Sequence, residues 1–295
     1  MQKKGSLANR RSWIQASVWF FIMLMLTLVV MTVWTILPID HQSTPALKWF
    51  QFFQTLATFF APPFLIAYLC SQEPKNWLHL DGKPVGWMAV SAIVIMVVAL
   101  PGINLLADWN SRMILPEWLK PLEDIMREQE DAAMVLTERF LSGEGVGTLL
   151  INIGLMAFLP AMAEELTFRG VLQNLIRNKH VAVWVVAFIF SAIHFQFFGF
   201  VPRMLLGALF GYMLVWTGTL WIPITMHFVN NAVTVIAFWI IYNNNLNHDT
   251  IENFGTGDTL WVGIMSFVLT GVGIYCFWRL SRTMNNASSR ISSGN

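Results

Sequence analysis

The chain has 295 residues, of which 56% are hydrophobic and 12% are charged, and its formal net charge is +1. Soluble globular domains carry about a quarter charged residues, so the composition excludes an ordinary soluble domain. The balanced charge also lacks the basic excess of a nucleic-acid-binding protein. Apolar runs near the roughly 20 residues that a membrane span needs recur along the chain. We therefore expect an all-α, polytopic transmembrane helix bundle.

Eight segments are predicted to span the membrane. The first follows four cations, as in a signal peptide, but its apolar run is too long and no small-residue cleavage site follows, so it is predicted to be retained. Cations gather in loops on the N-terminal side, which predicts cytoplasmic termini, and the chain is typical of a prokaryotic inner-membrane protein. The predicted spans are 13–37, 48–70, 85–106, 147–176, 181–198, 201–217, 220–242 and 259–279.

The connection at 107–146 differs from the other loops because it is long, charged and acidic. Apolar residues recur in it at helical spacing, which predicts one amphipathic helix outside the membrane. We expect this helix to pack its apolar side on the bundle. The apolar residues are Trp118, Leu119, Leu122, Ile125, Met126, Leu136 and Phe140.

Three regions follow from this organisation. Residues 1–146 form a three-span region with the acidic connector, and residues 147–242 form a helical core that holds the polar residues of the membrane interior. Residues 243–295 comprise a polar loop, the last span and a tail expected to be disordered from Asn285. Within the core, Gly207 and Gly211 are spaced as in a small-residue helix-packing face.

Ionisable groups inside the bilayer are informative because a charge at mid-span costs about 2.5–3.5 kcal/mol on insertion scales. At 1.5 Å per residue, Glu164 and His194 each lie roughly 20 Å from the turn that joins their spans. His227 lies about 15 Å from the turn at 217–219 on the same side. We therefore expect one polar layer, made by Glu164, Glu165 and Arg169 of the fourth span, His194 of the fifth, and His227 and Asn231 of the seventh.

Such a layer suits the hydrolysis of an acyl bond. Glu164, alone or with a histidine, would activate water as a general base. His227 and Asn231, four residues apart on one helix face, would stabilise the oxyanion. Glu165 and Arg169 have the same spacing and are expected to pair, which gives Arg169 a structural or a supporting role.

Other interpretations of these residues stay open. Ser191 lies three residues before His194, which allows a Ser/His arrangement. Glu164, His194 and His227 match a His₂Glu zinc set, although no H-E-x-x-H string is present. The cluster could also bind a partner without turnover, as in a scaffold or immunity protein. A proton relay in a transporter is a further alternative, but no inverted repeat or broken helix pair supports it.

Three motifs occur in order on predicted spans: Glu-Glu-x-x-x-Arg at 164–169, Phe-x-x-x-His at 190–194 and His-x-x-x-Asn at 227–231. Together they resemble the CPBP family, which comprises type II CAAX prenyl endopeptidases and bacterial bacteriocin-processing ("Abi") relatives. The resemblance covers about 147–242. It implies a glutamate-dependent intramembrane endopeptidase that hydrolyses membrane-associated substrates, either CAAX-type proteins or peptide precursors.

The resemblance also implies a role for each matching residue. Glu164 and His194 would activate water, and His227 and Asn231 would form the oxyanion site. Glu165 and Arg169 would support them. No cofactor is expected, although a metal has been argued both for and against in this family. The expected partners are a membrane-associated protein or peptide substrate and the lipid bilayer.

Overall fold

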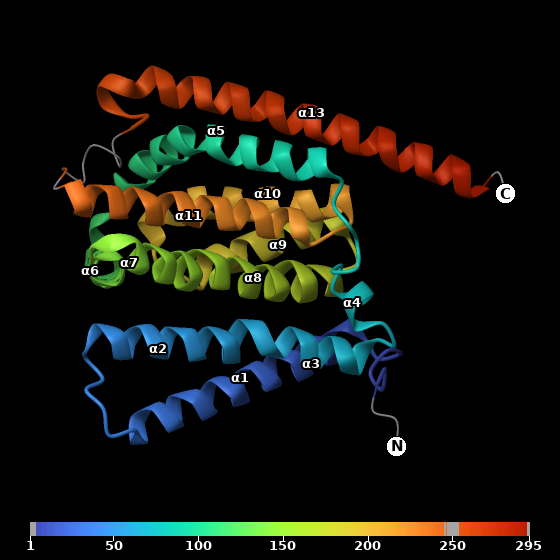
Figure 1. Ribbon diagram of the computed structural model, residues 1–295, viewed down its shortest axis with the longest axis horizontal. Coiled ribbons are helices and arrows are strands. Elements are labelled where there is room, and N and C mark those ends of the chain that lie inside the picture. Colours follow the sequence, from blue (N-terminus) through green and yellow to red (C-terminus); the bar gives the residue numbers. More distant parts are fainter. Residues whose placement is uncertain (1–3, 245, 247–253, 294–295) are drawn as a thin grey trace.

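The computed structural model is a bundle of helices (Figure 1), and it describes all residues except 1–3, 245, 247–253 and 294–295. The described residues form no strand. The N-terminal elements are α1 (Ser12–Ile36), α2 (Thr44–Thr55), η1 (Leu56–Phe60), α3 (Ala61–Cys70), α4 (Pro74–Trp77), α5 (Gly86–Ser111), η2 (Glu117–Leu119) and α6 (Lys120–Leu141). The later elements are α7 (Gly145–Asn152), η3 (Ile153–Phe158), α8 (Leu159–Glu165), η4 (Leu166–Gln173), α9 (Lys179–Ala192), η5 (Phe197–Gly199), α10 (Phe200–Thr217), α11 (Trp221–Asn244), η6 (Gly257–Thr259) and α13 (Leu260–Ser293).

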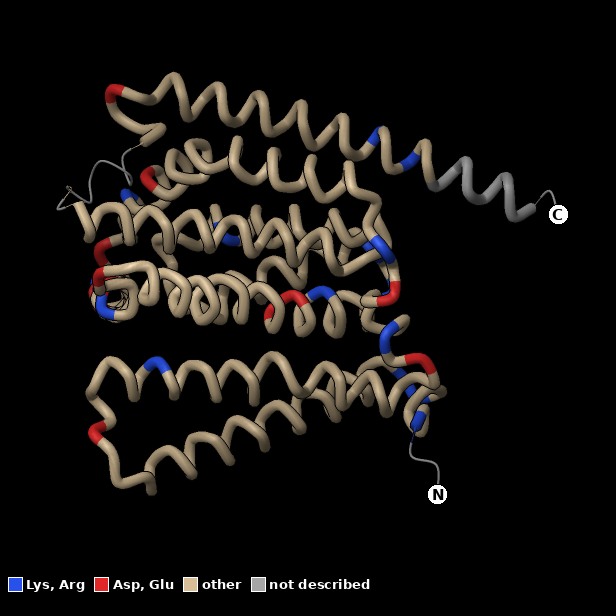
Figure 2. The backbone as a smooth tube through the Cα atoms, in the orientation of Figure 1, with Lys and Arg blue, Asp and Glu red and all other residues tan. Residues whose placement is uncertain are grey.

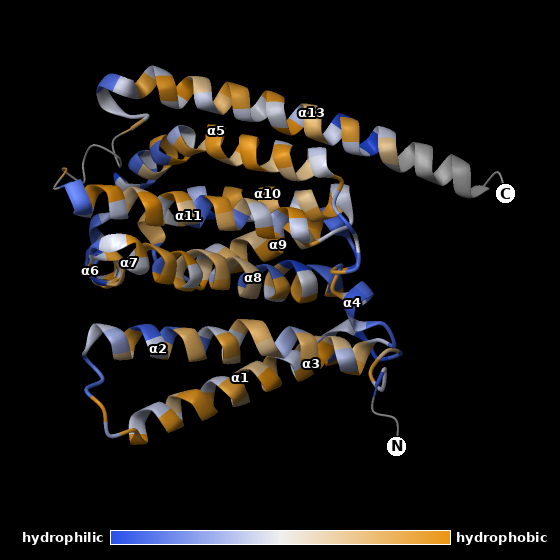
Figure 3. Cartoon of the chain, viewed as in Figure 1, coloured by the Kyte–Doolittle hydropathy of each residue, from blue (hydrophilic) through white to orange (hydrophobic). Residues whose placement is uncertain are grey.

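Seven helical segments of the described chain are long and apolar enough to cross a membrane. Figure 3 shows hydrophobic residues along most of α1 and α5. The predicted all-α polytopic bundle is confirmed, and the protein is an integral, multi-pass membrane protein. The seven segments are Ser12–Ile36, Thr44–Cys70, Gly86–Ser111, Gly145–Gln173, Phe197–Thr217, Trp221–Asn244 and Gly257–Met284.

The predicted span at 181–198 is wrong in its second part. Helix α9 has only 14 residues and ends at Ala192. Phe195 then adopts a φ of 55°, in the left-handed region that stops a helix. The following residues are still mostly apolar, so composition does not mark this end. Helices α9 and α10 nevertheless form a hairpin, and both termini lie at the same end of the bundle (Figure 1).

π-helical turns interrupt two of the spans before prolines. Segment η1 precedes Pro62 and Pro63, and η3 precedes Pro160. Proline has no N–H and its ring clashes with the carbonyl four residues earlier, so the preceding turn widens. The π-helical segment η4 has no such proline and begins directly after Glu165. It carries the arginine of the site described below.

The N-terminal hairpin of α1 and α2–α3 lies beside the rest of the bundle (Figure 1). A groove of about 770 Å³ separates α2 from α7 and α8, and its lining is mostly apolar. Lys48 lines this groove, and its Nζ donates to the side-chain oxygen of Asn152 at 2.8 Å. The hairpin is thus joined to the core by a polar contact inside an apolar interface.

The predicted amphipathic connector is α6, and its apolar stripe packs only in part. Met126 and Phe140 are buried on the bundle, whereas Leu122, Ile125 and Leu136 are exposed. Glu123 fixes the start of the helix, because its carboxylate accepts from the backbone N–H of Leu115 at 3.0 Å and from Arg127 at 2.9 Å. Further along, Glu130 accepts from the backbone N–H of Phe198 at 3.3 Å. Through Glu130, α6 contacts the turn between α9 and α10.

The C-terminal region differs from its prediction. Helix α13 continues to Ser293, through the segment expected to be a disordered tail. Extending an existing helix adds one hydrogen bond per residue and needs no new nucleus, so a weak helix-forming sequence can follow a strong one. Residues 245 and 247–253 of the predicted polar loop lie outside the described part of the chain.

Candidate active site

A buried ion pair lies in the middle of the bundle, where Figure 2 shows acidic and basic residues side by side in the span that contains α8. Nη1 of Arg169 donates to Oε1 of Glu165 at 2.7 Å, and both side chains are fully buried. Nη2 of Arg169 donates to the carbonyl of Gly207 at 2.9 Å. The predicted pairing of Glu165 with Arg169 is therefore present. Because both charges are out of water, each depends on the other for compensation.

Aromatic rings surround the guanidinium of Arg169. Its central carbon lies 4.7 Å from the ring centre of Phe190 and 5.5 Å from that of Phe210. Cations are attracted to the faces of aromatic rings at such distances. These rings also exclude water, so the ion pair has a fixed position and orientation.

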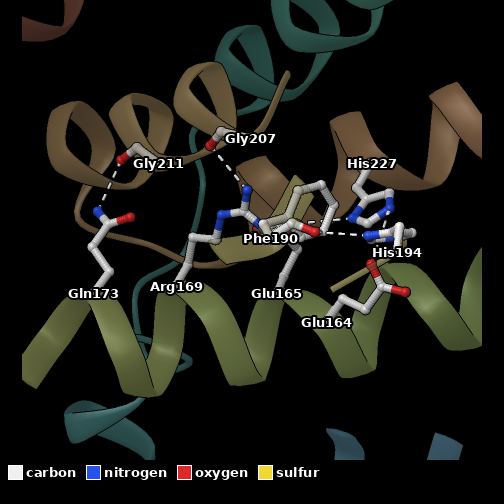
Figure 4. A network of polar contacts seen from close by, with 9 residues as sticks. All are labelled: Glu164, Glu165, Arg169, Gln173, Phe190, His194, Gly207, Gly211 and His227. Carbon is white, nitrogen blue, oxygen red and sulfur yellow. Dashed lines mark hydrogen bonds and ion pairs between the residues drawn. The ribbon is translucent and has the colours of Figure 1, made fainter. Parts of the chain in front are cut away.

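His227 joins the ion pair to Glu164 (Figure 4). Its Nδ1 lies 2.9 Å from Oε1 of Glu165, and its Nε2 lies 3.9 Å from Oε2 of Glu164. The Glu165 carboxylate, paired with Arg169, accepts hydrogen bonds, so Nδ1 of His227 carries the hydrogen. The ring also stacks on Phe210, with 5.2 Å between centroids. Glu165 and Phe210 thus direct Nε2 of His227 towards Glu164.

His194 lies in the turn just after α9, rather than within the predicted span. Its Nδ1 lies 2.7 Å from the carbonyl oxygen of Phe190, which can only accept, so Nδ1 is the donor. The other ring nitrogen of His194, Nε2, then carries a lone pair that can accept a hydrogen bond. Figure 4 shows the side chains of Glu164, His194 and His227 pointing towards one another. Among the described residues, however, the ion-pair contact of Glu164 within 4.0 Å is with His227 and not with His194.

Asn231 lies one turn beyond His227 on α11. Its side-chain oxygen accepts from the Nδ2 of Asn230 at 3.1 Å, which leaves the amide hydrogens of Asn231 as donors. No hydrogen bond joins Asn231 to Glu164 or His194 in the described part of the chain. Ser191 is engaged elsewhere, since its hydroxyl donates to the carbonyl of Phe200 at 2.7 Å. The Ser/His alternative therefore gains no support from the geometry.

Two polar residues near this cluster were missed in the sequence. Arg203, in the first turn of α10, donates to the backbone and side-chain oxygens of Gln196 at 3.1 and 2.9 Å, and its charge acts on Glu164. An arginine in a predicted apolar span was the available signal. Gln173 lies four residues after Arg169 and donates to the carbonyl of Gly211 at 3.0 Å. The predicted Gly207/Gly211 face thus packs α10 on α9 and also supplies two carbonyl acceptors.

The described residues contain no group of three His, Cys, Asp or Glu side chains arranged to hold a metal ion. This includes Glu164, His194 and His227, the zinc set considered from the sequence. No step below uses a metal.

Comparison with known proteins finds similarity in the segment that contains these residues. Residues 146–233 match the model of the Rce1-like type II CAAX prenyl endopeptidases. An uncharacterized protein of Bacillus subtilis (strain 168), YpbD, is 38% identical over 86 residues, which are 28% of this chain and 43% of YpbD. This chain therefore aligns with less than half of that relative. No solved structure matches. The matched segment holds Glu164, His194 and His227 and is similar to the Rce1-like type II CAAX prenyl endopeptidases.

Proposed function

We propose that the protein is an intramembrane endopeptidase that hydrolyses peptide bonds of membrane-associated proteins or peptides with water activated by Glu164. The observation that carries this proposal is the convergence of Glu164, His194 and His227 inside the bundle (Figure 4). The family match supports it, because the matched family is one of endopeptidases. Glu164 is accessible to water, because 17% of its side chain is exposed.

Glu164 and His194 activate the water in this mechanism. The carboxylate takes a proton as the water oxygen bonds to the scissile carbonyl carbon. Neutral His194 presents the lone pair of Nε2, because its Nδ1–H is held by the Phe190 carbonyl. That lone pair accepts a hydrogen bond from the same water and orients it. When the C–N bond breaks, the proton passes from Glu164 to the leaving nitrogen.

His227 and Asn231 stabilise the oxyanion. With Nδ1–H bound to Glu165, His227 donates to the oxyanion from Nε2, which requires a hydrogen on both ring nitrogens. Asn231 contributes amide hydrogens, since its oxygen is occupied by Asn230. Donors that are already in place cost no reorganisation as the charge develops. Glu165 and Arg169 act as positioning residues through His227.

The other regions follow from this assignment. Residues 147–242 are the catalytic core, and residues 1–146 and 243–295 enclose it. The mechanism needs no cofactor. We place the protein in a prokaryotic inner membrane with both termini in the cytoplasm, which is supported by the Lys and Arg residues at the end of the bundle where the termini lie (Figure 2). The substrate class includes CAAX-type proteins and peptide precursors.

The test is cleavage of a membrane-anchored peptide library by the purified protein, with mass spectrometry of the products. Wild type is compared with Glu164→Ala and His194→Ala, and thermal unfolding shows whether each variant is folded. We expect products with wild type only. Cleavage by either folded variant would refute the mechanism. If no protein cuts while a partner co-purifies equally with all three, the scaffold interpretation replaces the enzyme.

A further inference from the structure

The segment of η2 and α6 has an apolar side that the bundle leaves uncovered. Four large apolar residues share this side, and between 42% and 78% of each is exposed. On an α-helix they lie about 100° around the axis from Met126 and Glu130, which face the bundle. The four residues, which we call the outer stripe, are Trp118, Leu122, Ile125 and Leu136.

Charged residues occupy a third side of α6. Lys120 and Asp124 pair there at 3.2 Å, and both side chains are exposed. Asp131, two turns beyond Asp124, is exposed on the same side. The helix thus has one side on the bundle, one apolar exposed side and one charged exposed side. An apolar side beside a charged side is typical of a helix that lies in a membrane surface.

Polar contacts fix the rotation of α6 about its axis. Glu123 is buried and accepts from the backbone N–H of Leu115 at 3.0 Å. The central guanidinium carbon of Arg127 lies 4.2 Å from the ring centre of Phe198. Glu130 accepts from the backbone N–H of Phe198 at 3.3 Å. Rotation of α6 that turned the outer stripe onto the bundle would break these contacts, so the stripe stays exposed to whatever surrounds the protein.

The position of α6 places the outer stripe near the membrane surface. Figure 1 shows α6 end-on at the end of the bundle opposite the termini, so the helix runs across the ends of the spans. Only residues 112–116 separate it and η2 from α5, which is long and apolar enough to cross the membrane. Trp109, in the last turn of α5, is exposed, and tryptophan is enriched where spans meet the membrane surface. The outer stripe therefore begins within a few residues of the lipid-facing surface of α5.

From the uncovered apolar side, its fixed orientation and its place beside the end of α5, we infer that α6 lies in the membrane surface, with the outer stripe in contact with lipid acyl chains and the charged side in water. The helix has six acidic and three basic residues, so anionic headgroups do not attract it. The removal of apolar side chains from water drives the contact instead. Neutral and anionic phospholipids should therefore serve equally well.

The test uses fluorescence quenching of the full-length protein in phosphatidylcholine nanodiscs that hold one copy each. The free cysteines are removed by Cys70→Ala and Cys276→Ala, and one new cysteine at a time carries the fluorophore. Leu122→Cys and Ile125→Cys report on the outer stripe, and Asp124→Cys and Asp131→Cys are the matched controls on the charged side. The thermal unfolding midpoint shows that each labelled variant is folded.

A nitroxide attached to the lipid is expected to quench the fluorophore at Leu122→Cys and Ile125→Cys, and aqueous iodide is expected to quench it at the two controls. The same pattern should appear in nanodiscs that contain phosphatidylglycerol. Iodide quenching as strong on the outer stripe as on the charged side would overturn the inference. Protection of the outer stripe from both quenchers would also overturn it, because protein, from the bundle or from a bound partner, would then cover the stripe. Lipid quenching only in the discs with phosphatidylglycerol would contradict the apolar driving force.

Discussion

Glu164 and Glu165 are adjacent residues of the same type, but their surroundings differ. Glu165 is fully buried, and one of its oxygens accepts from both Arg169 and His227. Glu164 has 17% of its side chain exposed and lies 3.9 Å from Nε2 of His227. Neighbouring residues on a helix point about 100° apart, which sends one carboxylate into the core and the other towards the histidines. Replacement of each glutamate by neutral glutamine is therefore expected to affect stability and cleavage differently at the two positions.

Arg169 is expected to matter first for stability. In Arg169→Gln, the carboxylate of Glu165 is left buried without a counter-charge, and breaking a buried ion pair in this way costs about 3–5 kcal/mol. His227 also loses its fixed partner. The thermal unfolding midpoint in detergent should fall clearly, with activity falling as a consequence.

Arg203→Gln serves as the contrast to Arg169→Gln. Arg203 is half-buried, and its hydrogen bonds to described residues go to Gln196, so its loss should change the midpoint much less. Its charge acts on Glu164, so the cleavage rate should fall in a protein that remains folded. Equal midpoints for the two variants would show that the ion pair of Arg169 is not a structural element.

At the scale of elements, the hairpin of α9 and α10 positions His194. The two helices approach closely at Gly207, where an added Cβ would lie 3.2 Å from the Cα of Ala187 and 3.2 Å from the ring of Phe190. Phe190 in turn holds His194 through its carbonyl. The packing of α10 on α9 is thus connected to the orientation of His194, which we propose to be catalytic.

Gly207→Ala should therefore lower both stability and cleavage. Overpacking a close interface costs about 1–3 kcal/mol, and here it also displaces the carbonyl that accepts from Arg169. Gly271→Ala in α13 is the control, because nothing lies within 4 Å of its added Cβ. Alanine is a better helix former than glycine, so the control should be neutral or slightly more stable. If both variants have the wild-type midpoint and rate, the close contact does not position His194.

At the scale of the whole molecule, sequence patterns predicted the bundle and most of the polar layer. Glu164, Glu165, Arg169 and His227 were identifiable because ionisable groups inside a membrane are rare. The early end of α9 could not be predicted from the sequence, because the residues from Phe195 to Phe200 are mostly apolar. The pairing of His227 with Glu165 was also not predictable. It depends on the direction of each side chain around its helix, which a residue count along the axis does not give.

The most direct measurement is the cleavage rate of Glu164→Gln and Glu165→Gln beside wild type, with a thermal unfolding midpoint for each protein. Both variants preserve shape and remove one charge. Glu164→Gln should keep a midpoint near that of wild type and lose cleavage, because only the proposed water-activating base is removed. Glu165→Gln should lose stability as well, because Arg169 is left unpaired. A Glu164→Gln protein that cleaves at the wild-type rate would contradict the proposal that Glu164 activates the water.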